Sequence, residues 1–137
     1  MFASLLALNN TVDMNLSAVW FVELDSTGTV VRFYVDDTNY QQITGDAAMA
    51  YVAARQAWLP KTTDDKPRFA ALLKVSATLD ISTMNVQHIE VQPDRVRFYF
   101  SPTFYKEITG QDAEDYIAMR QRHMPKLRDV FSQLGER

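Results

Sequence analysis

The feature that most constrains this chain is an internal repeat. Residues 31–61 and 96–126 lie 65 positions apart and are identical at about half of their positions. Residues 31–34, Val-Arg-Phe-Tyr, recur unchanged as residues 96–99. Such self-similarity indicates that one structural unit occurs twice, and two copies in one chain indicate a fused pseudo-dimer rather than a solenoid.

The repeat extends upstream at a slightly different offset. It becomes 67, because the turn around Gly28 is two residues longer than the turn around Pro93. With this shift Asp13 corresponds to Asp80. Under the two offsets most residues of one unit have a counterpart in the other, apart from the two extra residues of the turn around Gly28. The polar segment between the units contains Pro67 and is typical of a linker.

Each unit is predicted to contain four strands. Apolar residues alternate along the first segment, and β-branched and aromatic residues fill the second, which is predicted to be one strand entered through a kink. The third segment alternates apolar residues with Arg and Tyr. In unit one the four strands are predicted at residues 2–8, 12–24, 31–35 and 40–43.

A helix is predicted to close each unit. Thr44 and Thr109 are predicted N-caps, because a hydroxyl can accept a hydrogen bond from the first free amides of a helix. After Pro125 the spacing i, i+3, i+4, i+7 predicts a further amphipathic helix. Its apolar stripe is the candidate partner contact; alternatively, it folds back over the chain's own sheet or helix. The stripe consists of Leu127, Val130, Phe131 and Leu134.

The predicted fold class is therefore α+β. It is a tandem duplication of a ββββα unit, an antiparallel meander plus a C-terminal helix, with pseudo-two-fold symmetry and an extra C-terminal helix. The alternative is two separate small barrels capped by helices. The expected organisation is repeat unit one at 1–61, a linker at 62–67, repeat unit two at 68–125 and an appended helix at 126–137, with both units sharing one core.

One pattern in unit one resembles a known family. It consists of residues 15–23, Asn-Leu-Ser-Ala-Val-Trp-Phe-Val-Glu, the hairpin that follows, and residues 43–45, Ile-Thr-Gly, before a helix. It is similar to small bacterial β-meander proteins of the flagellar-regulator type, and the strand pattern faintly resembles the LytTR type of DNA-binding domain. The resemblance covers most of each unit and implies a fold without any functional residue. Unit two departs from it, with Ser-Thr at residues 82–83.

Composition narrows the function classes. The net charge of -3 gives no general attraction to phosphate backbones or anionic lipids, and a LytTR-like DNA contact would require a basic face. The chain has no cysteine, no Gly-rich phosphate loop and no nucleophile-elbow serine. We expect no cofactor and no membrane contact. The short apolar start lacks a basic flank, so the expected localisation is cytoplasmic.

The Arg-Tyr pairs of the third strands are the candidate binding surface. Arg32, Tyr34, Arg97 and Tyr99 are predicted to project from the non-core face of equivalent strands. Arg and Tyr are enriched in interaction hot spots, and they also stack on and neutralise nucleic acid strands. The favoured alternative is that they pack on a half-buried sheet face.

The remaining polar candidates are interpreted as structural. Arg55 and Arg120 lie late in the two helices, where a cation is favourable. Asp13 and Asp80 resemble paired carboxylates for acid–base work, but a Thr-x-Asp sequence at a kink more often satisfies backbone amides. His88 has no second ligand at metal spacing, and no metal site is predicted.

The sequence favours a non-enzymatic protein-binding or assembly module, with a protein partner or self-association. A nucleic-acid-binding regulator that uses the Arg/Tyr sheet face is the alternative, disfavoured by the acidic charge. An enzyme with a site at the repeat interface is the third hypothesis.

Overall fold

The computed structural model of the chain describes residues 5–64 and 72–127. This part of the chain is α+β, with mostly antiparallel sheets and two α-helices. The elements are β1 (Leu5–Ala7), β2 (Asp13–Asn15), the 3-10 helix η1 (Leu16–Ala18), β3 (Phe21–Leu24), β4 (Val30–Tyr34), β5 (Tyr40–Thr44), α1 (Gly45–Trp58), β6 (Leu72–Lys74), β7 (Leu79–Ser82), β8 (His88–Gln92), β9 (Arg95–Tyr99), β10 (Tyr105–Thr109) and α2 (Gly110–His123).

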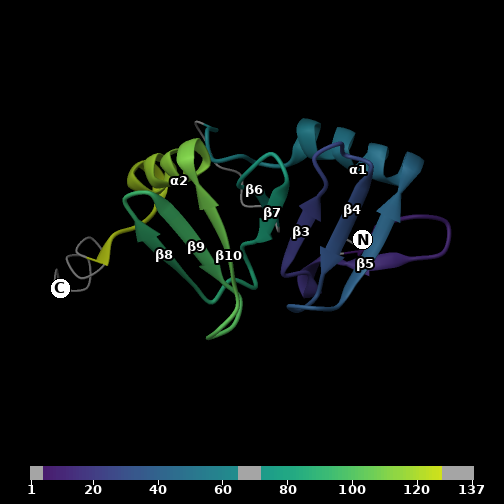
Figure 1. Cartoon of the computed structure of the whole chain (residues 1–137), viewed down its shortest axis with the longest axis horizontal. Helices are drawn as coiled ribbons and strands as arrows, with labels where there is room; N and C mark the ends of the chain where they lie inside the picture. The colour runs from purple at the N-terminus through teal and green to yellow at the C-terminus, as the bar shows by residue number, and fades with distance from the viewer. Residues whose placement is uncertain (1–4, 65–71, 128–137) are drawn as a thin grey trace, which may run out of the picture.

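The strands form three sheets (Figure 1). A five-stranded sheet has the order β5-β4-β3-β7-β6, a three-stranded sheet has the order β10-β9-β8, and β1 pairs with β2 alone. The pairing of β7 with β3 is the unexpected one, because it joins strands almost 60 residues apart into one sheet. Figure 1 shows α1 and α2 on the same side of the molecule, each beside its own set of strands.

The predicted ββββα unit is not confirmed, because the described residues contain ten strands in three sheets. The difference arises at the predicted kink in residues 12–24. There β2 ends at Asn15, whose side chain accepts a hydrogen bond from the backbone N–H of Ser17 and caps η1. The chain then enters a different sheet at Phe21. The predicted single strand is therefore two strands.

The two α-helices begin at a glycine turn and not at the predicted threonine cap. Thr44 and Thr109 occupy the N-cap positions, but neither side chain makes a capping hydrogen bond. Instead Gly45 and Gly110 adopt φ values of 57° and 58°, in the left-handed region that favours glycine. The glycine turns the chain directly from strand into helix.

The apolar core consists of two clusters, and each contains residues from both halves of the chain. Phe21 of β3 lies in the cluster built around Phe98 and Tyr116, whereas Leu72 of β6 lies in the cluster built around Phe33. The exchange follows from the pairing of β3 with β7, which places the β6–β7 hairpin between the two halves.

Aromatic stacking reinforces the contact between the halves. Trp20 stacks on Phe100 with ring centroids 5.8 Å apart, and Phe21 stacks on Phe104 at 5.7 Å. Lys106 lies over the Phe21 ring at 5.0 Å. The two aromatic pairs contribute about 0.5–1.5 kcal/mol each beyond the area that they bury.

The turn between β3 and β4 gives a prediction. Hydrogen bonds from the Thr27 hydroxyl and from the backbone N–H groups of Val30 and Thr29 lower the pKa of Asp25 from 3.8 to about 2. Because the folded-state pKa is depressed, the contribution of Asp25 to stability is present above pH 3.8 and is lost as the pH falls towards 2. An NMR titration of the Asp25 carboxyl carbon is expected to show this low midpoint. Thr27→Val should move it upward, and an unchanged midpoint in that variant would contradict the assignment.

Candidate functional site

The β6–β7 hairpin, residues 72–82 and hereafter the inserted hairpin, is held in a strand junction beside α1. Its strand β7 pairs with β3, and the N–H of Leu24 donates to the carbonyl of Thr78 at 2.9 Å. At the other end the N–H of Ser82 donates to the carbonyl of Trp20, also at 2.9 Å. On its far side β6 meets the segment after α1, where the N–H of Lys74 donates to the carbonyl of Pro60 at 2.9 Å.

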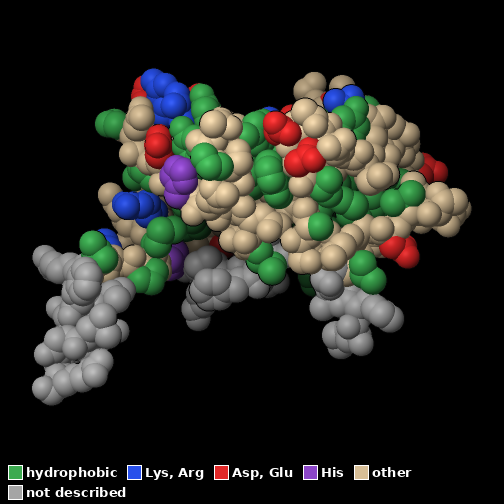
Figure 2. Space-filling model, turned by 90° about the horizontal axis from the view of Figure 1, so that it is seen from below, with side chains coloured by type: hydrophobic (Ala, Val, Ile, Leu, Met, Phe, Trp, Pro, Cys, Tyr) green, Lys and Arg blue, Asp and Glu red, His purple; other side chains and the backbone are tan. Residues whose placement is uncertain are grey.

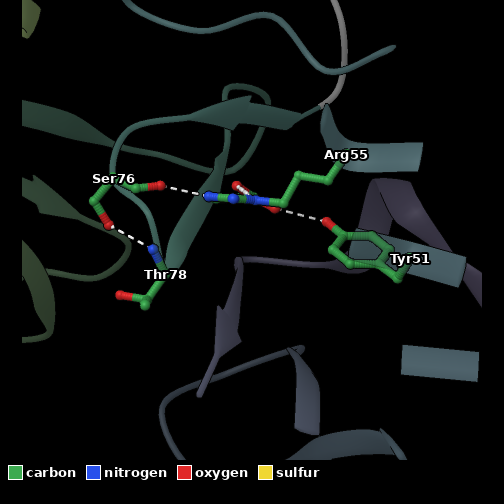
Figure 3. A network of polar contacts seen from close by, with 5 residues as sticks. Tyr51, Arg55, Ser76 and Thr78 are labelled. Atoms are coloured by element: carbon green, nitrogen blue, oxygen red, sulfur yellow. Dashed lines mark hydrogen bonds and ion pairs between the residues drawn. The ribbon is translucent and has the colours of Figure 1, made fainter. Parts of the chain in front are cut away.

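A buried ion pair fixes the inserted hairpin to α1 (Figure 3). The Nε of Arg55 donates to Oδ1 of Asp80 at 2.7 Å, and the hydroxyl of Tyr51 donates to Oδ2 at 2.7 Å. A second guanidinium nitrogen of Arg55 donates to the carbonyl of Ser76 in the loop of the hairpin. The side chains of Arg55 and Asp80 are 6% and 0% exposed. Tyr51, Arg55 and Asp80 are called the Asp80 cluster below.

The electrostatics of the Asp80 cluster depend on all three members. Burial raises the pKa of Asp80, and the charge of Arg55 and the hydrogen bond from Tyr51 act in the opposite direction. Burial also raises the pKa of Tyr51 well above its ordinary value, so the phenol stays protonated and keeps donating. The charge of Arg55 acts on Asp80 more strongly than that of Lys74, so removal of Arg55 or Asp80 leaves a buried charge without its ion-pair partner.

In the sequence repeat β8 and α2 are the counterparts of β3 and α1, and no described strand besides β9 pairs with β8. Tyr116 meets Phe98 edge to face at 5.2 Å, as its counterpart Tyr51 meets Phe33 at 5.0 Å. However, β8 is an edge strand of its sheet, whereas its counterpart β3 lies between β4 and β7.

Arg120, the counterpart of Arg55, is exposed. Within residues 5–64 and 72–127 it forms no ion pair, and the Tyr116 hydroxyl has no carboxylate partner. Burial raises the pKa of Tyr116, and the nearby charge of Arg120 acts against this shift. We call β8 with Tyr116 and Arg120 the open acceptor.

The segment after α1 is partly buried, whereas the segment after α2 is exposed. Pro60 and Thr62 are buried beneath the inserted hairpin, whereas Pro125 and Leu127 are exposed, Leu127 at 71%. A shallow hollow lies at this end of α2. It is lined by Arg120, Met124, Pro125, Lys126 and Leu127.

The structure places the predicted Arg-Tyr pairs on two different sheets. Arg32 lies over the Tyr40 ring at 4.7 Å, and Arg97 lies over the Tyr105 ring at 4.6 Å. Glu107 accepts a hydrogen bond from Arg97 at 2.8 Å and compensates its charge.

Each tyrosine of these pairs stacks on its own neighbouring strand. Tyr34 stacks on Phe21, and Tyr99 stacks on His88, both at 4.5 Å. The two Arg-Tyr pairs therefore make parallel local contacts and do not meet in one described cluster.

Of the predicted partner helix only Leu127 is described. Val130, Phe131 and Leu134 lie outside the described residues.

The Asp80 cluster is what sequence reasoning missed. The sequence predicts helix-end stabilisation for Arg55 and contacts with backbone amides for Asp80, and neither prediction includes the contact between them. The available signal was that all three members recur, as Tyr116, Arg120 and Asp13. Three polar residues that recur at matching positions of a helix and a strand are compatible with a contact between those elements.

Other kinds of site find no support among the described residues. No group of three His, Cys, Asp or Glu side chains there is placed to hold a metal ion. Neither α1 nor α2 has the length and apolar character that a membrane-spanning helix requires.

No protein-family model, curated protein sequence or solved structure matches this chain.

The buried ion pair gives the second prediction. Asp80→Asn removes the negative charge with little change of shape and leaves Arg55 uncompensated, so the free energy of unfolding should fall by about 3–5 kcal/mol. Asp94→Asn, which breaks an exposed ion pair with Arg95, is the matched control and should cost at most about 1 kcal/mol.

Urea unfolding measures both variants. Adding Arg55→Met to Asp80→Asn should cost less than the two single changes together, because the stranded charge is gone. Equal losses in Asp80→Asn and Asp94→Asn would contradict the role of the Asp80 cluster.

Proposed function

We propose that this chain is a protein-binding or assembly module that takes up an extended segment of polypeptide at the open acceptor. The observation that carries the proposal is the occupied junction in the same molecule, where the inserted hairpin pairs with β3 and its Asp80 binds Tyr51 and Arg55. The proposal treats the chain as two copies of one unit, with β8 and α2 as the counterparts of β3 and α1.

The backbone of β8 supports this function. An edge strand presents unpaired N–H and C=O groups, and addition of a strand from another segment satisfies them. In the occupied junction the N–H of Leu24 donates to the inserted hairpin. Its counterpart Val91 has no described partner across the open edge, since β8 pairs with β9 alone.

The side chains of α2 support a particular ligand chemistry. An exposed guanidinium next to a buried phenol matches the pair that holds Asp80 in the occupied junction. The segment that fits is therefore a strand with a carboxylate, and the carboxylate bridges Tyr116 and Arg120. Charge-assisted hydrogen bonds of this kind are about twice as strong as neutral ones, so they select the register of the incoming strand.

A peptide that copies residues 72–82 provides the test, because this sequence is already bound in one junction. The labelled peptide should bind the full chain saturably in a fluorescence anisotropy titration. Replacing Asp80 by Asn in the peptide, or Arg120→Ala in the chain, should weaken binding about tenfold or more, since each removes the ion pair.

Arg95→Ala is the matched control in the chain. It removes the same charge from β9, where Arg95 forms an exposed ion pair with Asp94, and should leave the affinity unchanged. The proposal is wrong if the peptide fails to bind, or if Arg120→Ala and Arg95→Ala have equal effects.

A further inference from the structure

We propose that the segment that fills the open acceptor is residues 5–15 of a second copy of this chain. This inference rests on the proposed function and names its partner. Residues 5–15 form the β1–β2 hairpin, hereafter the N-terminal hairpin.

The N-terminal hairpin has the same register as the inserted hairpin. Leu5 pairs with Asn15 and Ala7 with Asp13, just as their counterparts Leu72 and Lys74 pair with Ser82 and Asp80. The loops close alike: the N–H of Leu8 donates to Val12 at 2.9 Å, and the N–H of Val75 donates to Leu79 at 3.1 Å. The two hairpins are thus interchangeable in backbone shape.

One face of the N-terminal hairpin packs against the core of the first half of the chain. Met14 is buried in the cluster around Phe33, and its counterpart Ile81 is buried in the cluster around Phe98. Each hairpin therefore packs one face on the core of its own half of the chain.

The opposite face distinguishes the two hairpins. In the inserted hairpin Leu72 is 3% exposed and Asp80 is 0% exposed, because that face lies beneath α1. In the N-terminal hairpin Leu5 is 47% exposed, and Asp13 is exposed without an ion pair among the described residues. The carboxylate that would complete Tyr116 and Arg120 is thus present on the chain but unused.

A chain cannot fill its own acceptor while this arrangement holds. Figure 1 shows β8 at one end of the molecule and the N-terminal hairpin, drawn in purple, at the opposite end, and the hairpin is anchored there through Met14. A second copy is therefore required.

The occupied junction specifies the contacts between the copies. The pairs Phe21–Ile81, Val22–Asp80 and Glu23–Leu79 become His88, Ile89 and Glu90 opposite Met14, Asp13 and Val12 of the second copy. The bonds of Leu24 and Ser82 become a bond from the N–H of Val91 to Thr11 and one from the N–H of Asn15 to Gln87.

A second surface hollow lies beside the N-terminal hairpin, where the proposed contact places a side chain of β8 from the other copy. In the occupied junction the Phe21 ring packs against Phe100, Phe104 and Lys106, and its strand pairs with Ile81. The counterparts of these four residues all line one hollow beside the N-terminal hairpin. That hollow is lined by Val12, Asp13, Met14, Val35, Asn39, Tyr40 and Gln41.

His88, the counterpart of Phe21, is exposed on β8 and would enter this hollow on the second copy. The hollow lined by Arg120 and Leu127 would receive β1, as the segment after α1 receives β6. Both surface hollows thus fall on the two sides of one predicted contact.

The charges of the two sides are complementary. The last turn of α2 carries Arg120, Arg122 and His123, whereas the N-terminal hairpin offers Asp13. Figure 2 shows that on the face in view the Lys and Arg side chains gather mainly at the end of the molecule that carries the three-stranded sheet.

The junction between copies is weaker than the internal one. Trp20 and Phe21 have the polar counterparts Gln87 and His88, and Phe104 has the counterpart Asn39, so less aromatic surface is buried. We therefore expect reversible, concentration-dependent association. The contact is head to tail, which closes into a ring or continues as an open chain.

Charge reversal tests the occupant. Asp13→Lys and Arg120→Glu each place like charges in the junction, and each variant alone should raise the apparent dissociation constant of self-association at least tenfold in sedimentation velocity. The double variant, and an equimolar mixture of the two single variants, should regain the association of the wild-type chain, because opposite charges meet again in every junction. Both residues are exposed, so the fold should survive each change, and urea unfolding checks this.

The outcomes separate the two proposals. A wild-type chain that stays monomeric at all concentrations, while the peptide of residues 72–82 still binds, overturns the second copy as occupant and leaves the proposed function intact. Association that is insensitive to Asp13→Lys also overturns it. Failure of the peptide as well as of self-association overturns both.

Cross-linking tests the register independently, and the chain contains no native cysteine. Opposed residues of antiparallel strands lie about 4.5–5.5 Å apart at Cα, within the range of a disulfide. Val12→Cys mixed with Glu90→Cys should give a disulfide-linked pair of chains under mild oxidation. The control, Val12→Cys mixed with Gln92→Cys, is two residues out of register and should give several times less product; equal yields would contradict the register.

Discussion

The ion pair between Arg55 and Asp80 is the interaction on which the architecture depends. It joins a helix of the first half to a strand of the second at 2.7 Å, and both side chains are buried. Two buried charges gain their full attraction only in one geometry, so the pair fixes the register of β7 against β3. That register in turn decides which apolar residues enter each cluster, because a slip of one residue would turn Ile81 away from the core around Phe98.

The two halves of the chain differ in the side chains that surround β3 and its sequence counterpart β8. The internal junction adds aromatic stacking through Trp20 and Phe21 to the ion pair. At the counterpart positions Gln87 and His88 leave β8 polar on the same side. Aromatic burial stabilises the internal junction, and its absence beside β8 is the reason that the proposed junction between copies would be reversible.

Much of the local structure could be predicted from the sequence, and the pairing of distant strands could not. Alternation along residues 31–35 and the turn at Gly28 predicted β4 and its hairpin, because both signals are local. Period-two alternation predicts a strand but does not predict its neighbour in the sheet, so the pairing of β3 with β7 could not be predicted from the sequence. The kink predicted within residues 12–24 proved to be the end of a strand followed by the 3-10 helix η1, and three residues are too few to show a helical periodicity in the sequence. The Asp80 cluster was missed for the same reason: its members are local neighbours only after the distant strands have paired.

An exposed strand edge can pair with unrelated strands, and the polar side chains of β8 disfavour such pairing. Its outward residues His88, Glu90 and Gln92 are polar and exposed, which disfavours the apolar strands that drive aggregation. A strand that binds as proposed must also compensate Arg120, because the guanidinium would otherwise lose its hydration without gaining a partner. A strand with a correctly placed carboxylate meets this requirement, and one without it does not. Under the proposed function, the open acceptor would discriminate by the penalty that it imposes on mismatched strands as much as by the bonds that it offers to a matched one.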